Sequence, residues 1–394
     1  MANEYYEFFC PVKMVAGFKA LEHIPFELTS HGASRPLIIT DRGVRGVGLV
    51  DIVTNALDAV EMQAVDIFDD VPPDSSMLTV TTIANLYREK SCDSILAIGG
   101  GSVIDTAKGV NILVSEGGDD LRAYSGTGVV KKALKPFFVI PTTAGTGSET
   151  TNVSVIRDDE SGAKVPFVSP FLLPDAAILD PRMTLSLPPK ITAATGMDAL
   201  THAVESFIGL AKNPISDAYA ASAIKKITNN LADVLRNPSD ATGRLELAQA
   251  STMAGIAFSN SMVGMVHSLG HSVGAKCHVP HGMCMSIFLP YVLEFNLEEC
   301  RENIGELLLH LAGPDVYAAT AVADRPRKAI DTIVALKEEM YALCELPRKL
   351  SETGSVTEAD LEEIAHMALD DGSMMLNRID ATFEQALAVL KKAF

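Results

Sequence analysis

Positive charge is the clearest deficit of this sequence, because 32 lysines and arginines face 50 aspartates and glutamates and leave a formal net charge of −18. Binding to nucleic acid or to an anionic membrane surface requires a basic face, so the composition argues against both partners. The chain also has no tryptophan and no apolar run of the length that spans a bilayer. We therefore expect small molecules or proteins as partners.

Cysteine is scarce as well, with six residues that form no C-x-x-C pair: Cys10, Cys92, Cys277, Cys284, Cys300 and Cys344. This density does not resemble a disulfide scaffold, and a reducing compartment fits it best. The N-terminal segment MANEYYEFFCPVK carries acidic residues where a signal peptide carries positive charge. The sequence predicts a soluble, cytoplasmic protein.

The length of 394 residues exceeds what one hydrophobic core usually supports, so two domains are expected. Short apolar runs typical of strands buried on both faces lie at 36–40, 64–68, 94–100 and 136–141 and alternate with helical stretches. Beyond about residue 190 the pattern is helical almost throughout. The proline-rich segment LDPRMTLSLPPK marks the boundary, so we predict an α/β domain over 1–188 and an all-helical domain over 189–394.

A glycine-rich turn follows the third apolar run, in SILAIGGGSVIDTAKG, where Gly99, Gly100, Gly101 and Ser102 separate a strand from a helix. Glycines let the backbone approach a ligand closely, and the N–H groups at a helix start favour an anion. We therefore predict a pyrophosphate site. The pattern is not the G-x-G-x-x-G fingerprint, and the alternative is a tight turn in which Ser102 caps the helix.

Two further loops are candidates for the same ligand. Asp41 ends the first strand run, and an acid at this place accepts hydrogen bonds from an adenosine ribose, which favours NAD over NADP. A helix-capping Asp41 and a phosphate-binding Arg42 are the competing interpretations. The loop PTTAGTGSETT places Thr142, Thr143 and Thr146 after another buried strand. These threonines would meet the glycine turn if both strands end at one sheet edge; otherwise they only close a loop.

Histidine is concentrated in the segment VHSLGHSVGAKCHVPHG, which holds four of the nine: His267, His271, His278 and His281. Neutral imidazole is a common ligand of divalent transition metals. Upstream, TAATGMDALTHAVES spaces Asp198 and His202 four residues apart, so on a helix both would share one face. If the two segments meet, three nitrogens and one carboxylate oxygen would suit Zn or Fe(II) and leave a position for substrate.

Over nearly its whole length, the chain resembles the iron-containing (group III) alcohol dehydrogenase family. The resemblance rests on four motifs in order: GGGSVIDTAKG, PTTAGTGSE, D-x-x-x-H, and H-x-x-x-H followed by PHGMC. The resemblance implies a Rossmann-like parallel sheet that binds NAD, an all-α C-terminal domain, and a metal in the cleft between them. Dehydroquinate synthase shares this architecture. The implied ligands of the metal, Fe(II) or alternatively Zn, are Asp198, His202, His267 and His281. The expected cofactor-binding residues are Asp41, Gly99, Gly100, Gly101, Ser102, Asp105, Thr142, Thr143, Thr146, Thr151 and Lys164.

The implied activity is the interconversion of an alcohol and its aldehyde or ketone by hydride transfer with NAD(H), the metal polarising the substrate oxygen. His271 lies one helical turn from His267 and is the candidate catalytic group, as a proton relay or a substrate-orienting residue. The alternative is a hydrogen bond that fixes a metal ligand. His278 is expected to be structural or exposed, and Cys277 and Cys284 are expected to be packing residues.

Two positions depart from the family's pattern. VPPDSS stands where many members have a Pro-Asn-Pro turn, so Asp74 replaces a neutral amide near the cofactor. Cys284 is followed by Met285 where a Cys-Asn pair is frequent. Neither departure touches an expected metal ligand.

Other activities on this architecture are a glycerol dehydrogenase and a dehydroquinate synthase-like enzyme. The latter needs a basic pocket, and the segment from 190 to 290 has few lysines and arginines. A non-catalytic metal-binding protein would have no use for the nucleotide loops. The apolar residues Phe258, Met262 and Met265 favour short to medium aliphatic alcohols or aldehydes, and the family's habit implies a homodimer or a larger homo-oligomer.

Overall fold

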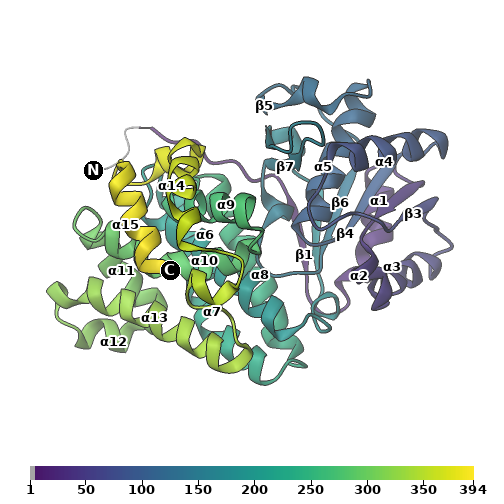
Figure 1. The fold of residues 1–394 in the computed structure, drawn as a ribbon. Coiled ribbons are helices and arrows are strands. Elements are labelled where there is room, and N and C mark those ends of the chain that lie inside the picture. Colours follow the sequence, from purple (N-terminus) through teal and green to yellow (C-terminus); the bar gives the residue numbers. More distant parts are fainter. Residues whose placement is uncertain (1–4) are drawn as a thin grey trace. The chain divides into compact units, whose positions relative to one another are not determined.

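The computed structural model describes residues 5–394, which divide into two compact units (Figure 1). An α/β unit comprises Phe9–Leu187. A helical unit comprises Pro188–Phe394, and residues 5–8 group with it rather than with the α/β unit. The sequence-based boundary after residue 188 assigned those N-terminal residues to the α/β domain instead.

The α/β unit is built around a six-stranded sheet with the order β1-β9-β6-β4-β2-β3, and every neighbouring pair is parallel. Its strands are β1 (Lys13–Ala16), β2 (Pro36–Ile39), β3 (Asp66–Phe68), β4 (Ser94–Gly99), β6 (Phe137–Pro141) and β9 (Ala176–Leu179). The four strands expected at 36–40, 64–68, 94–100 and 136–141 are thus confirmed as β2, β3, β4 and β6.

Both faces of this sheet are covered, because successive side chains of a strand point to opposite sides. Leu37 and Ile39 of β2 join one apolar cluster, while Ile38 between them joins the other. The first cluster is completed by α4 (Met77–Glu89) and α5 (Gly101–Glu116), and the second by α1 (Ile24–Ser30) and α3 (Leu49–Asp58). Continuous apolar runs are what two buried faces require. The short helix α2 (Arg42–Gly46) follows β2.

A second, three-stranded sheet, in the order β5-β8-β7, completes the unit. It consists of β5 (Gly126–Thr127), β7 (Val153–Arg157) and β8 (Lys164–Val168). Strands β7 and β8 form an antiparallel hairpin in which Arg157 lies opposite Lys164. This sheet was not predicted, because its strands are short and only partly buried.

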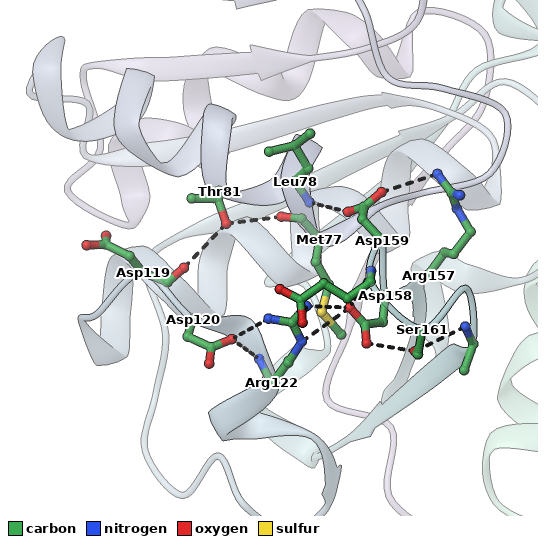
Figure 2. A network of polar contacts seen from close by, with 12 residues as sticks. Met77, Leu78, Thr81, Asp119, Asp120, Arg122, Arg157, Asp158, Asp159 and Ser161 are labelled. Carbon is green, nitrogen blue, oxygen red and sulfur yellow. Dashed lines mark hydrogen bonds and ion pairs between the residues drawn. The ribbon is translucent and has the colours of Figure 1, made fainter.

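Figure 2 shows the polar network that holds the turn of this hairpin. Arg122 donates to Asp158 Oδ1 over 2.6 Å, and Asp158 also accepts from the hydroxyl of Ser161. Both bonds keep the pKa of Asp158 far below its ordinary value. Asp159 accepts from the backbone N–H of Leu78 at the start of α4 over 2.8 Å. The network thereby ties the hairpin, with Lys164 at the start of β8, to α4.

The helical unit contains helices and no strand within the described residues. Its α-helices are α6 (Pro189–Ile208), α7 (Pro214–Arg236), α8 (Ala241–Ser259), α9 (Met265–Cys277), α10 (His281–Phe295), α11 (Arg301–Ala312), α12 (Pro314–Ala319), α13 (Arg325–Cys344), α14 (Leu361–Asp370) and α15 (Phe383–Ala393). Helix α6 packs against α7, α8 and α10, and α9 packs against α10 and α14. Among residues 5–394, no helix combines the length and the apolar character needed to cross a membrane.

Candidate functional site

Helix α6 supplies the first half of a candidate metal centre. Asp198 and His202 lie one turn apart on it, with Asp198 Oδ1 3.9 Å from His202 Nε2, and both side chains are buried. A helix is rigid and i and i+4 share a face, so the backbone itself sets this spacing.

The second half comes from the two helices that pack beside one another along the histidine-rich segment. His267 is the third residue of α9 and His281 the first of α10. His281 Nε2 lies 3.3 Å from Asp198 Oδ1. One ligand atom from each of the four side chains lies within 4.8 Å of the others. The structure therefore brings the two sequence segments together, and we call Asp198, His202, His267 and His281 the metal centre.

Gly282 allows α10 to begin this close to α6. A Cβ atom at Gly282 would lie 2.5 Å from the carbonyl oxygen of Ala194, which is closer than real Cβ contacts are. Any side chain there would push the start of α10 away from α6, and His281 would move away from Asp198. The glycine in PHGMC is therefore a packing requirement of the metal centre.

Three side-chain atoms of the metal centre are buried with no hydrogen-bond partner among residues 5–394, namely Asp198 Oδ1, His202 Nδ1 and His267 Nε2. Leaving such atoms unsatisfied costs about 1–3 kcal/mol each, so they require an explanation. A bound cation provides one, because three imidazole nitrogens and one carboxylate oxygen suit Fe(II) or Zn. The residues present therefore fit a metal ion.

The protonation states of these side chains also fit. Burial lowers the pKa of both His202 and His267, which keeps the two imidazoles neutral. For Asp198, burial alone would raise the pKa, but the imidazoles of His202, His281 and His267 outweigh it and lower that pKa. Neutral imidazole and ionised carboxylate are the forms that bind metals.

His271 lies beside the metal centre without belonging to it. Its ring stacks on that of His281 at a centroid distance of 5.3 Å and meets that of His267 edge-on at 5.7 Å. His271 Nδ1 lies 2.9 Å from Asp371 Oδ2. Burial would raise the pKa of Asp371, but the hydrogen bond with His271 lowers it to about 2. The side chain of His271 is 45% exposed, so it can reach a small molecule that enters at His281.

Sequence reasoning missed two acidic neighbours of the histidines. Asp371 directly precedes the 3-10 helix η9 (Gly372–Leu376), a hundred residues from His271, and no local pattern marks it. Glu205 follows His202 by three residues on α6 and contacts His267. Its i+3 position on the ligand-bearing face was a usable signal. Burial raises the pKa of Glu205 to about 7.

The remaining residues of the histidine-rich segment have the structural roles expected of them. His278 is exposed and ends α9 in the left-handed conformation, with φ = 56°. Cys284 is fully buried and Cys277 half-buried. Of the apolar residues considered for the substrate side, Phe258 stacks on His202 at a centroid distance of 4.2 Å, and Met262 is exposed.

In the α/β unit, the two candidate nucleotide loops leave the same sheet edge. Strands β4 and β6 pair in parallel with Gly99 opposite Pro141. A Cβ at Gly100 would lie 3.3 Å from Thr143, and one at Gly101 would lie 3.0 Å from Thr146. The predicted convergence of the glycine loop (Gly99–Ser102) and the threonine loop (Thr142–Thr146) is thus confirmed.

The glycine loop leaves the start of α5 open to an anion. The N-cap residue of α5 is Gly100, which has no side chain that could satisfy the first N–H groups of the helix. The alternative in which Ser102 caps the helix is wrong, because Ser102 lies inside the first turn and its hydroxyl donates to the carbonyl of Pro73. The backbone geometry therefore fits a phosphate group.

Asp41 does cap a helix. Its Oδ1 accepts from the backbone N–H of Val44 over 2.9 Å at the start of α2. The two arginines that follow are paired with acids at the end of β3, Arg42 with Asp70 at 2.8 Å and Arg45 with Asp69 at 3.3 Å. The capping interpretation is therefore correct, and the cap uses the Oδ1 atom of Asp41.

Several other candidate cofactor residues are engaged within the protein. Thr151 accepts from the buried Lys108 over 3.0 Å, which ties α5 to the segment before β7. Asp105 accepts from the backbone N–H of Val155 over 2.9 Å, which ties α5 to β7 itself. Thr142 is buried, and its N–H donates to the carbonyl of Gly99.

Lys164 is exposed and forms an ion pair with Asp74, at 3.1 Å from its Oδ1. Arg157 also approaches Asp74, at 3.6 Å. The acid that replaces the family's neutral amide is thus neutralised by two neighbouring cations.

Most of the chain matches two consecutive family models. The model described as iron-containing alcohol dehydrogenase matches residues 11–181, and the one for the C-terminal domain of the same family matches residues 192–394.

Individual relatives cover nearly the full length. An NAD-dependent methanol dehydrogenase from Bacillus methanolicus is 35% identical over 386 residues, which is 98% of this chain and 99% of that protein. The crystal structure of a 1,3-propanediol oxidoreductase superimposes with a TM-score of 0.94 at 32% identity and covers 99% of this chain and 100% of its own. A sulfoacetaldehyde reductase from Bifidobacterium kashiwanohense, in complex with NAD+, gives a TM-score of 0.86 at 26% identity, covering 99% of both chains.

Proposed function

This chain belongs to the iron-containing alcohol dehydrogenase family, and from that premise we propose which residues carry the reaction and which substrates it takes. It is an oxidoreductase that interconverts an alcohol and its carbonyl compound, with NAD and iron as cofactors. The observation that carries the assignment of the site is the metal centre, with its three buried atoms that lack a hydrogen-bond partner among residues 5–394.

The side chains of the metal centre hold the ion in the helical unit, and the loops of the α/β unit bind the dinucleotide. When bound, the ion polarises the oxygen of the substrate while NAD carries the hydride. His281 is the most exposed of the four ligands, at 39%, so we assign the substrate side of the metal centre to His281. Phe258 covers one face of His202 and excludes water there.

His271 is the proposed substrate-orienting and proton-carrying residue. Asp371 accepts a hydrogen bond from His271 Nδ1–H, which leaves Nε2 of His271 to contact a substrate or a water molecule. An imidazole held in one tautomer by a carboxylate is a suitable group for proton transfer near neutral pH.

The proposed substrates are short to medium aliphatic alcohols and aldehydes. Methanol, 1,3-propanediol and sulfoacetaldehyde, the substrates named for three of the relatives, are small. The ring of Phe258 stacks on that of His202 and places an apolar group beside the metal centre. The relatives favour this activity over that of a dehydroquinate synthase-like enzyme, and a glycerol dehydrogenase remains within the same reaction class.

NAD rather than NADP is the proposed dinucleotide for reasons of charge. Asp41 would repel a 2′-phosphate. Arg42 and Arg45, the cations that could hold such a phosphate, are each paired with an aspartate. A cytoplasmic location and a homo-oligomeric state complete the proposal, and the six free cysteines support a reducing compartment.

One experiment tests the proposal directly. The purified chain is reconstituted with Fe(II), Zn, Ni, Co or Mn and assayed with a panel of alcohols and aldehydes, with NAD and with NADP. We expect one NADH for each alcohol consumed and loss of activity on chelation. The absence of dinucleotide reduction with every metal and every alcohol would overturn the proposal.

A further inference from the structure

The ring orientation of His267 depends on how α9 begins. His267 is the third residue of this helix, and the N-cap position before it is Gly264. A glycine has no side-chain oxygen with which to satisfy the first N–H groups of the helix. A cap must therefore come from elsewhere in the fold.

Glu205 of α6 supplies this cap. Its Oε1 accepts from the backbone N–H of Val266, the second residue of α9, over 2.7 Å. A Cβ at Gly264 would lie 3.2 Å from the same oxygen and 3.3 Å from Asn377 Oδ1. A larger residue at 264 would be crowded by both oxygens, so the glycine and the glutamate belong to one arrangement.

The other oxygen of the same carboxylate faces the metal ligand. Glu205 Oε2 lies 2.5 Å from His267 Nδ1, and both side chains are 3% exposed. A neutral imidazole carries one ring proton, and a carboxylate oxygen at Nδ1 holds the proton on that nitrogen. The lone pair is then on Nε2, which is the buried atom without a partner among residues 5–394.

We propose that Glu205 is a positioning residue of the metal centre, which fixes the tautomer and ring orientation of His267 through one oxygen and the start of α9 through the other. This inference rests on the proposed ligand role of His267. Carboxylates that accept the second ring proton of a metal-binding histidine typically change metal affinity about 10- to 100-fold.

Two variants, Glu205→Gln and Ser268→Ala, separate positioning of the metal ligand from a purely structural role of Glu205. Glu205→Gln keeps the size of the side chain, but an amide offers one acceptor oxygen where the carboxylate offers two. It can accept from Val266 or from His267 Nδ1, and the remaining contact then faces an NH2 group. Ser268→Ala is the matched control, because it removes a buried hydrogen bond of α9, from Ser268 Oγ to the carbonyl of Ala368, next to the same ligand without touching it.

The test is metal affinity, measured on the full-length apoprotein by competition between the protein and a chromophoric chelator for Zn(II) or Co(II), together with the visible spectrum of the Co(II) form. We expect Glu205→Gln to weaken binding about 10- to 100-fold and to alter the Co(II) bands. Ser268→Ala should lower the melting temperature of the apoprotein and leave affinity and spectrum unchanged.

Glu205→Asp keeps both acceptor oxygens on a shorter side chain and should recover part of the affinity, which keeps the inference testable if the glutamine variant does not fold. Wild-type affinity and spectrum in Glu205→Gln, or equal losses in Glu205→Gln and Ser268→Ala, would overturn the inference. His267→Ala separates this outcome from failure of the proposed function: if that variant also binds metal normally, the metal centre itself is wrong.

Discussion

The metal centre and the nucleotide loops are built from different parts of the polypeptide. In the helical unit, the functional atoms belong to side chains on three helices, and their geometry follows from helix packing. In the α/β unit, the functional atoms of the glycine loop are backbone N–H groups, and side chains there would only obstruct the approach of a ligand. A substitution should therefore damage the metal centre through the loss of a side chain and the glycine loop through the gain of one.

The largest effect is expected from loss of a ligand. His267→Ala should abolish stoichiometric metal binding and reduce kcat by roughly a thousandfold, because several kcal/mol of electrostatic stabilisation are lost. Metal content and alcohol oxidation are the measurements. His278→Ala, eleven residues along the same segment and exposed, is the control and should behave as the wild type. Normal metal content in His267→Ala would contradict the assignment.

Gain of a side chain in the glycine loop should impair dinucleotide binding and leave metal binding intact. Gly101→Val places methyl groups against Thr146, where a Cβ alone would lie 3.0 Å from Cγ2. We expect weaker NAD binding, by roughly 10- to 100-fold for a loss of about 1–3 kcal/mol, with full metal content. Fluorescence titration with NADH measures it. Gly46→Ala is the control, because Gly46 has open space around it, and it should leave NADH binding unchanged. An equal loss of NADH affinity in Gly46→Ala would contradict the assignment of the dinucleotide to the glycine loop.

A smaller effect is expected where a side chain acts through another. Asp371→Asn should lower kcat about tenfold, less than the full contribution of a proton-transfer residue, because His271 loses the acceptor that orients it. Metal content should not change. The measurement is kcat against pH, beside Asp370→Asn as the neighbouring control. A kcat equal to that of the wild type would remove Asp371 from the proposed mechanism.

The smallest effect concerns charge on the surface of the α/β unit. Asp69→Asn combined with Asp70→Asn frees Arg45 and Arg42, and the kcat/KM for NADP should rise by less than about fivefold, because exposed ion pairs contribute about 0–1 kcal/mol. The ratio of kcat/KM for NADP to that for NAD checks it. A fall in that ratio would mean that the two arginines do not face the 2′ position.

The two units also differ in how far the sequence alone predicted them. The strands β2, β4 and β6 were predictable because continuous apolar runs bounded by turn residues suit only a sheet buried on both faces. Strand β1 and the small sheet were missed, because partly exposed strands carry little pattern. Strand β9 was missed although it is fully buried and as long as β2. In the helical unit, the i, i+4 spacing of Asp198 and His202 predicted their shared face.

Residue types and their spacing thus determined the α/β and all-helical parts, the glycine and threonine loops, and the shared face of Asp198 and His202, because these depend on periodicity and on motifs that lie within a few residues. The choice of His267 and His281 among the four histidines of their segment followed from the resemblance to the family. Only the tertiary structure decided that Glu205 caps α9 and faces His267, that Asp371 pairs with His271, and that Gly282 allows α10 to begin beside α6. These contacts join residues up to a hundred positions apart, and packing of rigid helices, rather than any local sequence preference, brings such residues together.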